Sequence, residues 1–101
     1  MKQYNLTGSE KQIAWATDIL NSGWGTIERN IARCAESAEK WPTEAAMFDA
    51  DAALWNEIRA AYGEATKNIT TAREVIDRRK QLDGDAVVNA FNVMTMQRQA
   101  R

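Results

Sequence analysis

Closely spaced carboxylates are the side chains of this 101-residue chain that come nearest to a reactive arrangement. Glu36 with Glu39, or Asp49 with Asp51, could in principle bind a hard cation. Neither pair belongs to an Asp-x-Asp-x-Asp-Gly loop or a Glu-x-x-His motif, and the sequence contains no histidine. Catalytic triads, histidine metal sites and imidazole acid-base chemistry are therefore excluded by composition. We expect a protein that is not an enzyme, with no cofactor and no metal, whose carboxylates form a solvated face.

A glycine-containing segment and the single cysteine could also carry chemistry, but both indicate a role in helix packing instead. Gly23 and Gly25 flank Trp24, but no Gly-Lys-Ser/Thr or third glycine follows, so the segment does not match a phosphate-binding loop. Cys34 is the single cysteine and cannot form a disulfide within the chain. Its place in a row of apolar residues predicts a small buried side chain.

Length and composition indicate one small domain with its own core, because 45% of the residues are apolar. No apolar run approaches the roughly 20 residues of a membrane-spanning helix. The first six residues also lack the apolar region of a signal peptide. We expect a cytoplasmic protein.

Apolar residues at alternating steps of four and three predict a long first helix over residues 9–41. Ser9 and Gln12 have the spacing of a capping box, which marks the start of this helix. Gly23 and Gly25 favour a bend, and we expect a bent but continuous helix, with two helices and a loop as the alternative. The apolar row of this helix consists of Ile13, Leu20, Trp24, Ile27, Ile31, Cys34, Ala38 and Trp41.

Pro42 ends the first helix and suits the first turn of a second one, predicted over residues 43–82. Gly84 as a C-terminal cap and Asp85 as an N-cap then separate a third helix over residues 86–99. The apolar row of the second helix consists of Phe48, Ala52, Trp55, Ile58, Tyr62, Ala65, Ile69, Ala72 and Ile76.

The two apolar rows have matching lengths, so the sequence predicts an all-α fold of one domain built on an antiparallel, coiled-coil-like hairpin. With the turn near residue 44, Trp24 faces Ala65 and Cys34 faces Trp55, which places large side chains opposite small ones. We expect the third helix to pack at the base of this hairpin, where it would cover Trp15 and Ile19.

Acidic residues concentrate at the predicted turn, since residues 36–64 carry seven acidic and two basic side chains. An acidic tip suits a basic groove on a protein partner, and a groove built for nucleic acid is the commonest such target. Apolar side chains near the turn lack cover from the third helix, so we expect partner docking or a homodimer there. The acidic tip consists of Glu36, Glu39, Glu44, Asp49 and Asp51, and its apolar neighbours are Trp41, Met47 and Phe48.

The opposite end of the hairpin carries an alternative, nucleic-acid-binding site. Arg73, Arg78, Arg79 and Lys80 could contact phosphates, although the same residues are favourable at a helix C-terminus for dipole reasons alone. Interspersed carboxylates and an isoelectric point near 5.4 disfavour dedicated nucleic-acid binding. A self-assembling structural protein is the third alternative.

The segment Leu6–Ala16, with the sequence Leu-Thr-Gly-Ser-Glu-Lys-Gln-Ile-Ala-Trp-Ala, resembles an N-terminal motif of small proteins from bacteria, plasmids and phages. It covers about a tenth of the chain, and the likeness departs at Leu20–Asn21, where the related sequences tend to have a basic residue. The resemblance implies a mobile-element setting, in which short acidic proteins often inhibit host defence machines, as anti-CRISPR proteins do. We therefore expect a helical inhibitor that acts by stoichiometric binding to a protein, with direct contact to nucleic acid or membrane not expected.

Overall fold

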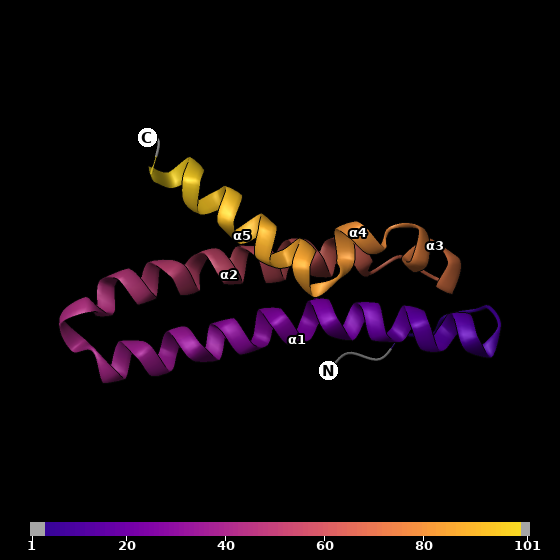
Figure 1. Cartoon of the computed structure of the whole chain (residues 1–101), viewed down its shortest axis with the longest axis horizontal. Helices are drawn as coiled ribbons and strands as arrows, with labels where there is room; N and C mark the ends of the chain where they lie inside the picture. Colours follow the sequence, from indigo (N-terminus) through magenta and orange to yellow (C-terminus); the bar gives the residue numbers. More distant parts are fainter. Residues whose placement is uncertain (1–3, 100–101) are drawn as a thin grey trace.

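The computed structural model describes residues 4–99, which fold into α helices and one 3-10 turn without β strands (Figure 1). The all-α fold class is therefore confirmed. The elements in chain order are α1 (Glu10–Lys40), η1 (Pro42–Glu44), α2 (Ala45–Thr66), α3 (Ala72–Asp77), α4 (Arg79–Leu82) and α5 (Gly84–Gln99).

Helix α1 runs without interruption through Gly23 and Gly25, as the expectation of one continuous helix requires. Its N-terminus is closed by the predicted capping box: the Gln12 amide donates to the Ser9 hydroxyl, and the Gln12 side chain accepts from the Ser9 amide. The helix buries Leu20, Trp24 and Ile27 along one face. Apolar spacing at three and four residues therefore explains which side of α1 meets the rest of the chain.

Helices α1 and α2 lie side by side and run in opposite directions, with Pro42 in the first turn of η1 between them (Figure 1). Trp24 faces Ala65 in the predicted register. Its ring instead meets Tyr62 edge to face, with ring centroids 4.8 Å apart. Cys34 and Trp55, the other predicted pair, both line one small cavity. The close approach of Tyr62 to α1 is accommodated by Gly23, where a β-carbon would overlap the Tyr62 hydroxyl oxygen.

The prediction of one helix over residues 43–82 is wrong, because α2 ends at Thr66 and the backbone changes direction before α3. The Thr7 amide donates to the Thr70 carbonyl, and the Ala72 amide donates to the Thr7 carbonyl, both at 2.9 Å. The N-terminal segment thus supplies the hydrogen bonds that a continuous helix would have made for itself. Thr71 then caps α3 by accepting from the Glu74 amide.

The third predicted helix starts two residues early and lies in a different place. Asp83, not Asp85, is its cap, since the Asp83 carboxylate accepts from the Ala86 amide at 2.8 Å. Helix α5 then runs from the middle of α1 towards the α1–α2 turn, where Phe91 stacks on Trp55 with ring centroids 4.6 Å apart. Short helices α3 and α4 occupy the base instead, because the break after α2 reverses the chain there (Figure 1). Trp15, which α5 was expected to cover, is exposed.

The buried hydroxyl group of Tyr62 links α2 to α1 and to α4. The hydroxyl donates to the Leu82 carbonyl at 2.6 Å and lies 3.4 Å from the Leu20 carbonyl. Burial raises the pKa of Tyr62 far above its ordinary value, and nearby Tyr4 and Asp83 raise it further. The proton therefore stays on the phenol and remains available for donation.

Trp55→Ala should lower the free energy of unfolding by roughly 3–5 kcal/mol, because it empties a buried site and removes the stack on Phe91. Trp55 is 3% exposed, whereas Trp41 is 53% exposed. Trp41→Ala is therefore the matched control, with an expected loss below about 1 kcal/mol. Urea titrations followed by circular dichroism measure both values, and equal losses would contradict this packing.

Tyr62→Phe should cost about 1–3 kcal/mol near neutral pH, because the Leu82 carbonyl loses its buried donor. The folded-state pKa of Tyr62 is raised above its unfolded value. Its contribution is therefore complete below about pH 10 and declines as the pH rises above that value. Urea titrations should show that the unmodified protein and Tyr62→Phe differ less in free energy of unfolding at about pH 11 than at about pH 8. A difference that is constant or widens would contradict the buried hydroxyl.

Candidate functional site

The acidic tip surrounds the turn between α1 and α2. Glu36 and Glu39 end α1, Glu44 belongs to η1, and Asp49 lies early in α2. These four side chains are exposed, and none forms an ion pair within residues 4–99. Their charges are therefore solvated and available to a partner.

Asp51, the fifth predicted acidic residue, is half-buried and has an intramolecular role. Its carboxylate lies 3.3 Å from the Arg98 guanidinium, which links α2 to the end of α5. The pKa of the Cys34 thiol is raised by burial and by the Asp51 charge, while Arg33 acts in the opposite direction. The elevated pKa keeps Cys34 in the thiol form, so the site does not provide a reactive thiolate.

Two of the three predicted apolar neighbours are exposed at the turn. Trp41 and Met47 each expose 53% of their surface. The Lys40 ammonium lies 6.0 Å from the centroid of the Trp41 ring. Phe48 instead lines a small cavity of about 170 Å³ and is only partly accessible. The exposed apolar surface of the tip thus comes from Trp41 and Met47.

The basic residues of the alternative site lie on α3, on α4 and, for Arg78, between the two, and intramolecular contacts hold three of them. Arg73 lies 3.8 Å from Asp77, and Arg78 lies 3.6 Å from Glu74. Arg79 donates to the Ile76 carbonyl and lies over the Trp15 ring, while Lys80 is exposed. Arg98, being paired with Asp51, lies away from this group at the far end of α5.

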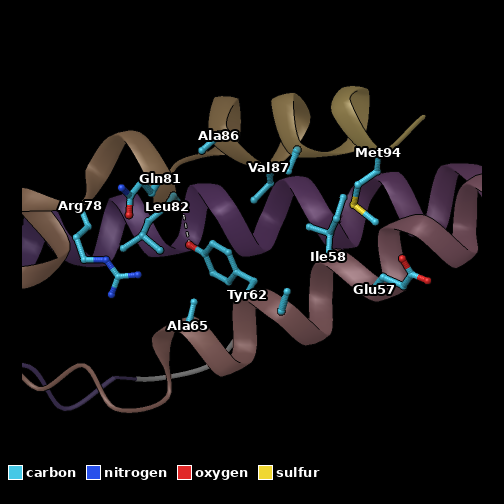
Figure 2. A pocket seen from close by; sticks show the side chains of 12 residues that line it. Glu57, Ile58, Tyr62, Ala65, Arg78, Gln81, Leu82, Ala86, Val87 and Met94 are labelled. Carbon is cyan, nitrogen blue, oxygen red and sulfur yellow. Dashed lines mark hydrogen bonds between the residues drawn. The ribbon is translucent and has the colours of Figure 1, made fainter. Parts of the chain in front are cut away.

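A groove between α2, α4 and α5 was not predicted from the sequence (Figure 2). It has a volume of about 520 Å³. The prediction of an unbroken helix over residues 43–82 leaves no place for it. Small residues at four-residue spacing, Ala61 with Ala65 and Ala86 with Ala90, are the sequence signal that could have indicated it. The lining residues are Glu57, Ile58, Ala61, Tyr62, Ala65, Arg78, Gln81, Leu82, Ala86, Val87, Ala90 and Met94.

Among residues 4–99, no helix is long and apolar enough to cross a membrane. The same residues contain no group of three or more histidine, cysteine, aspartate or glutamate side chains that could hold a metal ion.

Comparison of the chain with family models, curated proteins and solved structures found no match.

Proposed function

We propose that this chain is a non-enzymatic protein that binds a protein partner through the acidic tip and the exposed side chains of Trp41 and Met47. The supporting observation is the combination at one turn of four unpaired carboxylates with two large apolar side chains, each 53% exposed. Protein interfaces commonly join an apolar centre to a polar rim, and tryptophan is among the residues that most often dominate their binding energy.

The charge of the tip indicates the chemistry of the partner. Residues 36–51 contain five acidic residues and one basic residue, Lys40, for a net charge of −4. Such a surface is complementary to a basic groove and accelerates association with it at moderate salt. A groove that normally holds nucleic acid has this chemistry, so occupation by the tip would exclude the nucleic acid.

A protein that inhibits by occupying a basic groove needs a stiff, narrow projecting part. The long helices α1 and α2 could supply such a part as a coiled-coil-like hairpin. The described residues extend 51 × 28 × 18 Å. We infer a role in inhibiting a host macromolecular machine, in keeping with the resemblance of Leu6–Ala16 to segments from mobile-element proteins. The proposal does not rest on that segment, in which Ser9 caps α1 and Ala16 is buried.

Direct binding of nucleic acid through α3 and α4 is the rival function. The intramolecular contacts of Arg73, Arg78 and Arg79 reduce what these side chains can offer to phosphates. Four carboxylates of the acidic tip, those of Glu36, Glu39, Glu44 and Asp49, form no ion pair within residues 4–99, which favours the protein-binding proposal.

The partner can be captured from a bacterial lysate with the immobilised protein and identified by mass spectrometry. Replacing Glu39, Glu44 and Asp49 together by lysine should weaken binding of that partner by at least about tenfold, because three favourable charge contacts become repulsive. Helicity and melting temperature should change little, since exposed charges contribute little to folding. Binding by the unmodified protein should weaken as salt rises and should compete with nucleic acid.

The matched control replaces three exposed carboxylates far from the turn, Asp18, Glu64 and Asp77, by lysine. This variant has the same net charge as the tip variant. It therefore distinguishes the loss of local contacts at the tip from a change in the overall electrostatic field of the protein. Equal loss of binding in the two variants would contradict the proposal. A nucleic-acid mobility shift by the unmodified protein, abolished by Arg78→Glu with Arg79→Glu, would favour the rival function.

A further inference from the structure

The groove between α2, α4 and α5 is an apolar surface with small residues on the helices of two sides. Ala61 and Ala65 come from α2, and Ala86 and Ala90 come from α5. Tyr62 lies between the two walls, with its hydroxyl turned away to the Leu82 carbonyl, so its ring presents carbon to the groove (Figure 2). Small side chains such as these let the backbone of an incoming helix approach closely.

The apolar surface continues beyond the groove onto the outer side of α5. Val93 follows Ala90 by three residues and Ala86 by seven, so it lies on the same side of the helix. Val93 is 43% exposed, and Met96 near it in sequence is 67% exposed. A small molecule in the groove would leave these side chains in water, whereas a protein surface would cover both.

Opposite charges occupy the two ends of the groove. Figure 2 shows Arg78 at one end and Glu57 beside Met94 at the other. Glu57 forms no ion pair within residues 4–99, and Arg78 has only the Glu74 contact at 3.6 Å, between partly exposed side chains. Exposed pairs of this kind are weak, so Arg78 can exchange its partner at little cost.

We propose that the occupant of this groove is a second copy of the chain, related to the first by a twofold axis. When this axis is perpendicular to the groove, rotation places the two grooves antiparallel, so Arg78 of each protomer faces Glu57 of the partner subunit. The same rotation brings α5 of each protomer, with Val93, against α5 of the other. An apolar groove that is positive at one end and negative at the other is thus complementary to itself.

Sedimentation across micromolar to millimolar concentrations should show a monomer–dimer equilibrium for the unmodified chain. Arg78→Glu and Glu57→Lys, each tested alone, should raise the dimer dissociation constant by about tenfold or more, because each creates two like-charge contacts. An equimolar mixture of the two variants should restore association to within about threefold of the unmodified protein, because both contacts in the mixed dimer become attractive.

The mixed dimer makes the experiment independent of folding, since two misfolded variants would not regain association when combined. Native mass spectrometry identifies it, because the substitutions give the two subunits different masses. A monomer at all concentrations would overturn the proposal and leave the groove to a different occupant. A dimer that neither substitution weakens, or a mixture without preference for the mixed species, would also overturn it by placing the interface elsewhere.

Discussion

The close approach of α2 and α4 to α1 at Gly23 is the contact on which the arrangement of this protein depends. A β-carbon at Gly23 would overlap both the Tyr62 hydroxyl oxygen and the Leu82 carbonyl oxygen. That hydroxyl donates to that carbonyl at 2.6 Å, in a site where both groups are shielded from water. A buried donor and acceptor that satisfy each other make this three-way contact specific, because separating them would leave the Leu82 carbonyl without its buried donor.

The position of α5, and with it both candidate surfaces, follows from this contact. Leu82 ends α4, and Gly84 begins α5 against α1, where a β-carbon would lie only 2.7 Å from the Thr26 hydroxyl oxygen and 2.8 Å from that of Ser22. Helix α5 therefore starts beside the middle of α1 and extends towards the turn, ending at the Arg98–Asp51 pair. It forms one wall of the groove and stops short of covering Trp41 and Met47.

Local patterns in the sequence predict the helices better than they predict how these pack. The capping box at Ser9 and the acidic tip depend on neighbouring residues, so spacing and charge reveal them. The break after Thr66 depends on Thr7, whose backbone pairs with Thr70 and Ala72 from far along the chain. The apolar row keeps its phase across that break, so periodicity alone could not show it. The groove exists only because of this break and was therefore missed as well.

Comparing Gly23→Ala with Gly63→Ala by urea titration tests the central contact most directly. Both glycines are helical, so helix propensity alone predicts that each alanine stabilises the protein by up to about 1 kcal/mol. A β-carbon at Gly63 would meet only the Trp24 ring, at an ordinary 3.7 Å. We predict that Gly63→Ala is neutral or stabilising, whereas Gly23→Ala lowers the free energy of unfolding by at least about 2 kcal/mol, because it pushes Tyr62 and Leu82 away from α1. Equal or greater stability of Gly23→Ala would show that α2 and α4 do not meet α1 there, and would contradict the account.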